Sequence, residues 1–324
     1  LQRCSSRAKQ EVSRMRIETA ALVGAGWGRV HIGALRAAQV EVVQLIGRDL
    51  QRTEQAAREE GIKRASTELR EIEADLVVLA SPTPVHAEHL RALAGRVVLM
   101  EKPVVGPNLP EGALRTLPEL CFVNYAFPFV EVVQAADAVL DRAKSIVAVE
   151  VEVRLELPST KSVDDWLLDV AAHPLAWVEH RVGPLRQVSR SAGGAGARFE
   201  LQGHQGVPVH LRFALGGATG IAYRLRWWCE RTGGGPSPIE VHGTLLLGEP
   251  WTFGGAGFEP PPPPAADPWI VANYRSVAAN VSALRSGGPV HRVRDRGLFD
   301  LERGLFAERA LLGEDYVRAL RCEP

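Results

Sequence analysis

The chain is poor in cysteine, and the few it has exclude several kinds of protein. Four cysteines occur among 324 residues, and Cys4, Cys121, Cys229 and Cys322 are far apart without metal-binding or redox spacing. This pattern favours free thiols in a reducing compartment over a disulfide framework or a zinc site. We therefore expect a cytoplasmic protein without a bound metal.

Net charge and long apolar runs are also missing. The 38 basic residues balance 38 acidic ones, which gives no electrostatic signal for a nucleic-acid or membrane-surface partner. No apolar stretch reaches the roughly 18 residues that a membrane span requires. The composition therefore predicts no nucleic-acid or membrane partner.

The length indicates two domains, since domains usually hold roughly 100 to 200 residues. Apolar residues make up 46% of the chain, enough for a sizeable core. Residues 1–14 are polar and basic, and we interpret them as a disordered segment or an extension. Residues 15–125 form the expected first domain and residues 126–324 the second, whose C-terminal helices can return to the first.

Short apolar runs alternate with amphipathic stretches throughout the first domain. This rhythm is typical of a doubly wound parallel sheet, the Rossmann arrangement, with right-handed crossovers. The expected strands are 20–23, 40–46, 75–80, 97–100 and 120–124, and the expected helices run from the first glycine turn to 38, over 50–60 and over 86–94.

The rhythm changes after Asn124, where longer alternating segments predict an α+β domain with a largely antiparallel open sheet. Residues 130–143 read as a helix, and the expected strands are 145–157, 197–202, 207–215, 220–230 and 239–247. Gly254–Asp267 contains a proline run, so we expect a loop there. The tail 268–320 is helical by its periodicity.

A glycine cluster follows the first strand and precedes a helix. Gly24, Gly26 and Gly28, with Trp27 between the last two, lie where glycine lets a backbone approach a pyrophosphate. The third glycine comes one residue earlier than in the G-x-G-x-x-G pattern. Either the turn is one residue tighter or the phosphate contacts differ.

Arg48 follows the second strand, where dinucleotide folds select between cofactors. An acid there binds the ribose hydroxyls of NAD, whereas an arginine accommodates the 2′-phosphate of NADP. Asp49 comes one place too late to be the obvious acid. NADP(H) is therefore favoured and NAD(H) stays possible, and a solvated Arg-Asp turn is the alternative.

Polar residues follow two more buried strands. Glu101-Lys102-Pro103 comes after 97–100, and Ser81-Pro82-Thr83-Pro84-Val85-His86 comes after 75–80. Open α/β sheets bind ligands at the carboxyl ends of their strands. Both segments are thus candidate ligand contacts, although each also reads as an ordinary turn.

With the glycine cluster, these segments resemble the glucose-fructose oxidoreductase / inositol dehydrogenase / rhizopine catabolism (Gfo/Idh/MocA) family. The resemblance covers nearly the whole chain from Met15. It implies an NAD(P)-dependent oxidoreductase that transfers a hydride to or from a hydroxyl or carbonyl of a small, sugar-like substrate. It also implies cofactor contacts, namely Gly24, Gly26, Trp27, Gly28, Arg48, Ser81, Pro82, Thr83, His86, Glu101 and Lys102.

Asp169 and His173 are four residues apart, so a helix would project both side chains from one face. On its own the pair is most simply an ordinary helical pair. The family resemblance implies that it carries the acid/base residues, with Lys102 as the third catalytic group. Ala176 stands where the family often has a second aspartate.

Two other interpretations stay open. The short glycine spacing is also similar to the thiazolinyl imine reductases, which reduce a C=N bond, although Lys102 stands where they carry histidine. A non-catalytic NAD(P)-binding regulator would have no need for Lys102, Asp169 and His173. The family's architecture further implies a homodimer or homotetramer.

Overall fold

The structure is a computed structural model that describes residues 11–12, 15–104, 120–156, 163–193, 196–216, 220–230, 237–246, 248–286, 288–289, 299–300 and 310–311. It divides into two compact units. Unit 1 holds the described residues of Leu1–Tyr125 and Asn273–Leu305, and unit 2 holds those of Ala126–Ala272 and Phe306–Glu314. No helix within these described ranges is long and apolar enough to cross a membrane.

Unit 1 is built on a sheet with the strand order β16-β7-β6-β5-β2-β3-β4. Six strands are parallel, and β16 pairs with β7 antiparallel. Residues Ala20–Leu22 and Leu76–Leu79 are almost completely buried, as strands covered on both faces require. The strands are β2 (Thr19–Val23), β3 (Glu41–Ile46), β4 (Arg64–Ser66), β5 (Leu76–Leu79), β6 (Val97–Glu101), β7 (Leu120–Asn124) and β16 (Phe299–Asp300).

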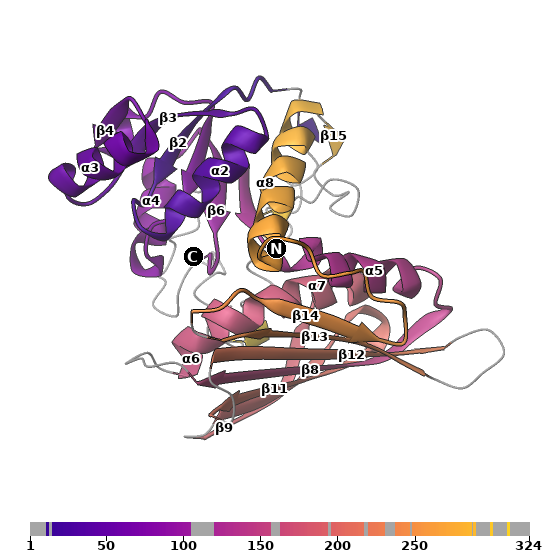
Figure 1. Cartoon of the computed structure of the whole chain (residues 1–324). Coiled ribbons are helices and arrows are strands. Elements are labelled where there is room, and N and C mark those ends of the chain that lie inside the picture. The colour runs from indigo at the N-terminus through magenta and orange to yellow at the C-terminus, as the bar shows by residue number, and fades with distance from the viewer. Residues whose placement is uncertain are drawn as a thin grey trace. The chain divides into compact units, whose positions relative to one another are not determined.

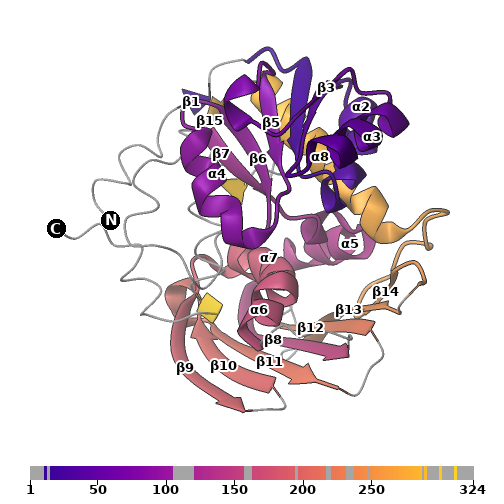
Figure 2. The same cartoon turned by 90° about the vertical axis from the view of Figure 1, so that its left-hand side faces the viewer.

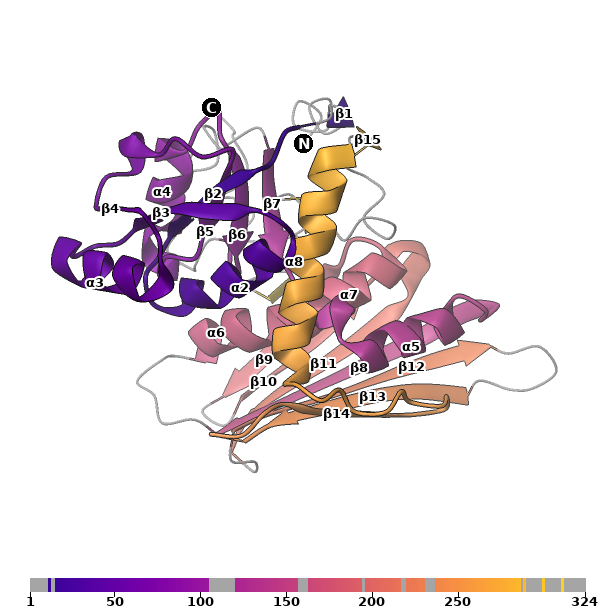
Figure 3. The same cartoon turned by 45° about the horizontal axis from the view of Figure 1, so that its top comes forward.

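Helices cover both faces of this sheet (Figures 1 and 2). Helix α4 (His86–Ala92) lies on one face, and α2 (Val30–Ala37), α3 (Leu50–Glu60) and α8 (Pro268–Ser286) lie on the other. Apolar residues of α8, including Val277 and Val281, share one buried core with Ile32 and Leu35 of α2. Figure 3 shows α8 beside α2. The doubly wound parallel sheet predicted for the first domain is therefore confirmed.

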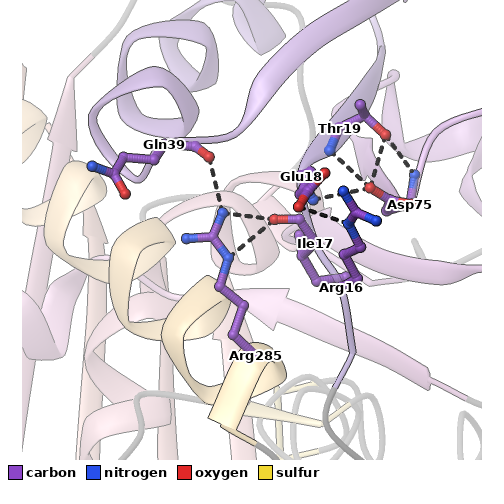
Figure 4. Close-up of polar contacts among 7 residues, drawn as sticks. All are labelled: Arg16, Ile17, Glu18, Thr19, Gln39, Asp75 and Arg285. Atoms are coloured by element: carbon purple, nitrogen blue, oxygen red, sulfur yellow. Dashed lines mark hydrogen bonds and ion pairs between the residues drawn. The ribbon is translucent and has the colours of Figure 1, made fainter.

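Arg285 joins the C-terminal end of α8 to the rest of unit 1 (Figure 4). Its guanidinium donates hydrogen bonds to the carbonyl oxygens of Ile17 at 2.6 and 3.0 Å, and of Ala38 and Gln39 at 2.9 Å each. Nearby, a carboxylate oxygen of Asp75 accepts bonds from the backbone N–H and the hydroxyl of Thr19, at 2.9 Å each. The Arg285 contacts fix α8 to the segment before β2, and the Asp75 contacts hold the N-terminal ends of β2 and β5 together.

Unit 2 is built on a second sheet with the order β14-β13-β12-β8-β11-β10-β9. All neighbouring pairs are antiparallel except β11 and β8, which are parallel. Helices α5 (Glu131–Leu140), α6 (Val163–Trp166) and α7 (Ala172–Val182) cover one face (Figure 1). The strands are β8 (Ser145–Glu156), β9 (Arg186–Gly193), β10 (Gly196–Gln202), β11 (Pro208–Leu215), β12 (Gly220–Glu230), β13 (Ser237–Leu245) and β14 (Thr252–Ala256). The largely antiparallel sheet was correctly predicted.

The structure corrects two expectations for the second half. Gly254–Ala256 were expected in a loop but belong to β14, which pairs with β13. A Cβ on Gly254 would lie 2.5 Å from the His242 ring, so glycine there permits close packing of an edge strand. The helical tail is wrong at Phe299–Asp300, which form β16 because they pair with β7.

Other described pieces were not anticipated. Strands β4 and β9 went unnoticed, because both are edge strands with much exposed surface. Residues 11–12 form a short strand, β1 (Glu11–Val12), paired with β15 (Gly288–Pro289). The rest of the predicted extension 1–14 lies outside the described residues, as do most of the expected tail helices.

Candidate functional site

The glycine turn after β2 fits a dinucleotide cradle. Gly24 has φ of +115°, and a Cβ there would lie 2.3 Å from the carbonyl oxygen of Ala80. A Cβ on Gly28 would lie 3.1 Å from the Cβ atom of Ala80, whereas a Cβ on Gly26 would meet nothing within 4 Å. Gly24 thus makes the turn, Gly28 permits close packing and Gly26 leaves open space, which are the three glycine roles of dinucleotide folds.

A 3-10 turn over Trp27–Arg29 explains the early third glycine. It leads directly into α2, so Gly28 reaches the packing position one residue sooner. Of the two readings of the spacing, the structure has the tighter turn. Trp27 itself is 63% exposed beside this turn.

The end of β3 presents Arg48 to solvent and uses Asp49 for structure. The carboxylate of Asp49 accepts a hydrogen bond from the Arg52 N–H at 2.9 Å and caps α3. Arg48 is exposed, and the neighbouring Gly24 N–H donates to the Ile46 carbonyl at 2.8 Å. Arg48 therefore follows β3 at the same sheet edge as the glycine turn.

The segment after β5 is tied to the segment after β6 by His86. Its Nε2 lies 2.6 Å from the Ser81 carbonyl oxygen, and its Nδ1 lies 2.7 Å from that of Pro103. His86 is 1% exposed, so the structure gives it backbone partners rather than an open ring face. Pro82 is exposed and Thr83 half-buried.

Ser81 has a second histidine partner. The Ser81 hydroxyl lies 2.9 Å from Nδ1 of His89, one helical turn beyond His86. Burial lowers the pKa of His89, so its neutral ring can accept a hydrogen bond from the Ser81 hydroxyl near neutral pH. His89 was not recognised from the sequence as part of this segment.

Glu101, the last residue of β6, is the centre of a buried polar network. One of its carboxylate oxygens lies 2.9 Å from Nε2 of His31 and accepts from the Asn124 amide, also at 2.9 Å. The Asn124 amide also donates to Asn273 at 2.7 Å and accepts from the Ser276 hydroxyl at 2.6 Å. The network joins α2, β6, β7 and α8, because Glu101 pairs with Asn124 in the sheet register.

The Glu101 carboxylate is held in its charged form. Burial alone would raise the pKa of Glu101, but the hydrogen bond and charge of His31, the Asn124 amide and the charge of Lys102 lower it to about 2. Lys102 follows at the end of the strand, is half-buried, and is joined to Pro103 by a cis peptide bond. A fixed negative charge therefore lies beside Lys102.

In unit 2, Asp169 lies within a π-helical turn, and His173 follows that turn at the start of α7. Leu167–Ala171 form a π-helical turn, and α7 begins at Ala172. The expected helix is present, but it contains a π-helical turn at Asp169. His173 is 6% exposed and Asp169 half-buried, and the His173 ring packs at right angles to Trp269, with centroids 4.8 Å apart.

The sequence did not predict the hydrogen-bond partners of Glu101 and Asn124. His31 follows the glycine turn by three residues, but nothing in its local pattern marks it as buried. Asn273 and Ser276 lie about 150 positions from Asn124, on one face of α8. A signal was present in the polar positions of an otherwise apolar helix face, since buried polar side chains need partners.

The structure describes two of the four cysteines and most of the side chains that could bind a metal. Cys121 and Cys229 are buried free thiols, whereas Cys4 and Cys322 lie outside the described residues. In the described part of the chain, no three or more His, Cys, Asp or Glu side chains gather into a possible metal site.

Solved structures share this fold across nearly the whole chain. An NAD-binding oxidoreductase from Klebsiella pneumoniae matches with a TM-score of 0.67 and 15% identity, over 94% of this chain and 97% of that one. A biliverdin reductase from Synechocystis, solved with biliverdin and NADP+, gives 0.66 and 16%, over 92% and 98%. A scyllo-inositol dehydrogenase from Lactobacillus casei gives 0.65 and 15%, over 93% and 95%.

The sequence itself matches a family model over the first domain. Residues 19–114 match the oxidoreductase family with an NAD-binding Rossmann fold, Gfo/Idh/MocA. Among curated proteins, none matches the chain. Residues 19–114 are thus similar to the Gfo/Idh/MocA family of oxidoreductases, and this part of unit 1 carries the NAD-binding Rossmann fold that the family model describes.

Proposed function

We propose that this oxidoreductase transfers a hydride between NADP(H) and a hydroxyl or carbonyl carbon of a small polar, sugar-like substrate. The observation that carries the proposal is Lys102, a half-buried cation next to the ionised, buried Glu101 at the carboxyl end of β6. A family member without catalysis has no need for a lysine there. The scyllo-inositol dehydrogenase neighbour supports a polyol-like substrate class.

The turn after β2 supplies the cofactor cradle. The backbone at Gly26 has open space where a pyrophosphate can approach, and Trp27 and Ser81 lie in segments at the carboxyl ends of β2 and β5. Bound nicotinamide supplies the hydride acceptor or donor. The protein's part is to bind, orient and exchange the proton.

Three side chains perform that part. Lys102 donates a hydrogen bond to the reacting oxygen and stabilises negative charge as it develops there. His173 accepts the hydroxyl proton in oxidation and returns a proton to the carbonyl oxygen in reduction, because imidazole exchanges protons near neutral pH. Asp169 orients the His173 imidazole or holds a second substrate hydroxyl.

The NADP(H) preference rests on Arg48. Asp49, the only acid in the Gly47-Arg48-Asp49 turn, is engaged in capping α3, which leaves the exposed Arg48 for a 2′-phosphate. Arg48→Ala is expected to weaken NADPH binding about tenfold or more while hardly changing NADH binding. The control is Arg58→Ala on the exposed side of α3, and equal weakening of both nucleotides by Arg48→Ala would contradict the preference.

The test of the reaction is an activity panel with the full chain. Reduced and oxidised forms of both nucleotides are supplied with sugars, sugar nucleotides, inositols and cyclic imines, and nucleotide turnover is followed by absorbance. Turnover of a polyol or its ketone, lost in Lys102→Ala, supports the proposal. Turnover of cyclic imines alone would favour the imine reductase, and nucleotide binding without any turnover would favour the regulator.

A homodimer or homotetramer stays a prediction. The sheet face of unit 2 opposite α5–α7 carries paired charges, for example Arg226 with Glu240 at 2.7 Å and Arg224 with Glu240 at 3.4 Å. Light scattering decides the question, and a mass equal to one chain would contradict it.

A further inference from the structure

The helical segment that carries Asp169 and His173 has a proline, Pro174, in the first turn of α7. In an α-helix, the carbonyl of Val170 would accept from the N–H of residue 174, but residue 174 is proline and has none. The Tyr223 hydroxyl, from β12, lies 3.0 Å from the Val170 carbonyl oxygen and donates to it. A strand side chain thus completes the helical segment that carries Asp169 and His173.

Tyr223 is suited to a permanent donor role. It is 3% exposed, and burial, with the nearby charge of Asp169 as the second cause, raises the pKa of Tyr223. The hydroxyl therefore keeps its proton throughout the pH range in which enzymes work. The Tyr223 hydroxyl can therefore act as a constant hydrogen-bond donor to the Val170 carbonyl.

The same tyrosine is connected to His173 through stacked rings. Tyr223 stacks on Trp251 with centroids 5.6 Å apart and planes 9° apart, and Trp251 stacks on Trp269 at 5.1 Å and 24°. Trp269 then contacts the His173 ring edge-on at 4.8 Å and 88°. We call Tyr223, Trp251 and Trp269 the aromatic clamp.

Asp267 fixes two members of the clamp to each other. One carboxylate oxygen accepts from the Trp269 N–H at 2.8 Å and the other lies 3.3 Å from the Trp251 N–H. The clamp is therefore anchored in β12, in the residue before β14 and in the first turn of α8. Aromatic contacts of this geometry contribute about 0.5–1.5 kcal/mol each beyond the burial of their area.

We propose that the aromatic clamp positions the His173 imidazole for proton transfer. Tyr223 holds the backbone at Val170, three residues before His173, and Trp269 contacts the ring itself, so both the supporting backbone and the imidazole are restrained. This inference rests on the proposed function for its catalytic meaning. Its structural part, the restraint of His173 by Tyr223 and Trp269, stands apart from any activity.

The test combines imidazole NMR with steady-state kinetics on the full chain. The His173 signal is identified as the resonance missing from His173→Gln. Tyr223→Phe keeps the ring and removes only the hydroxyl, whereas Trp269→Leu removes the ring contact. Trp228→Phe is the matched control, because Trp228 lies on the other face of β12 and is half-buried.

We expect Tyr223→Phe and Trp269→Leu to shift the His173 resonance and to lower kcat about tenfold or more, with the KM for nucleotide within about twofold of the wild type. Trp269→Phe should recover much of the kcat lost in Trp269→Leu. Trp228→Phe should leave the resonance and kcat unchanged.

The outcomes separate the two claims. An unmoved His173 resonance in both clamp variants would overturn the clamp. A moved resonance with wild-type kcat, together with wild-type kcat in His173→Gln, would leave the restraint standing and overturn the catalytic role of His173. A moved resonance with wild-type kcat in the clamp variants, but lost kcat in His173→Gln, would overturn positioning by the clamp.

Discussion

The two units hold their candidate functional groups in different ways. In unit 1, Gly24, Ser81 and Lys102 follow parallel strands and Glu101 ends one, so the topology brings them to the carboxyl edge of the sheet. In unit 2, Asp169 and His173 lie on a helical segment that contains a π-helical turn and is supported by aromatic side chains from distant parts of the chain. Backbone connectivity positions the first set, and side-chain packing positions the second.

The largest expected effect tests whether both sets serve one reaction. Lys102→Ala and His173→Ala should each lower kcat by about 10²–10⁴-fold, as loss of a proton-transfer or oxygen-stabilising group does, with nucleotide binding retained. Lys63→Ala and His242→Ala are matched controls, because both residues are exposed. Near-normal turnover in both site variants would contradict the assignment.

A second prediction concerns the buried charge in unit 1. The pKa of Glu101 is lowered to about 2 from an ordinary 4.5, so its stabilising contribution is complete above pH 4.5 and is lost as the pH falls toward 2. The difference corresponds to roughly 3 kcal/mol. Glu101→Gln should therefore be less stable than the wild type at pH 7, and the gap should close between pH 4.5 and 2.

Urea unfolding of both proteins across that pH range measures this gap. Other carboxylates titrate in both proteins alike, so the difference isolates Glu101. A gap that stays constant with pH would show that the carboxylate is not held ionised by His31 and Asn124.

The third prediction separates the two roles of glycine in the turn after β2. Gly24→Ala should cost about 1–3 kcal/mol in unfolding free energy because of its positive φ, and more where its Cβ meets the Ala80 carbonyl. Gly26→Ala should leave stability within about 0.5 kcal/mol and weaken nucleotide binding. Denaturant unfolding with nucleotide titration distinguishes them, and equal stability losses would refute the division of roles.

The smallest expected effect concerns α8. Arg285→Met keeps the aliphatic packing and removes the hydrogen bonds to Ile17 and Gln39, which Figure 4 shows, and the one to Ala38. A loss of about 1–2 kcal/mol in unfolding free energy follows, since part of the site is open to water. Arg58→Met on the exposed side of α3 is the control, and an equally small change in both variants would mean that Arg285 does not anchor the helix.

The contrast between the units also explains what the sequence could predict. Helix α3 begins and ends at the predicted Leu50 and Glu60, because Asp49 caps one end and Gly61 adopts φ of +67° at the other. Such signals are local. The Lys102 segment was likewise visible, since charge directly after an apolar strand is conspicuous.

The unpredicted features depend on contacts between distant residues. The Val170 carbonyl in the π-helical turn takes its donor from Tyr223, about 50 residues later, and the Glu101 network needs Asn273 and Ser276 from α8. The contact between the His86 ring and the Pro103 carbonyl could not be predicted for the same reason, because Pro103 follows β6, the next strand in the chain. Periodicity reports burial of a face but not the partner that covers it.

Calorimetric titration of the full chain with NADPH and NADH tests the central claim most directly. The account predicts saturable binding of one nucleotide per chain, tighter for NADPH, and weakened for both in Gly26→Ala. A chain that is folded by circular dichroism yet binds neither nucleotide would contradict it.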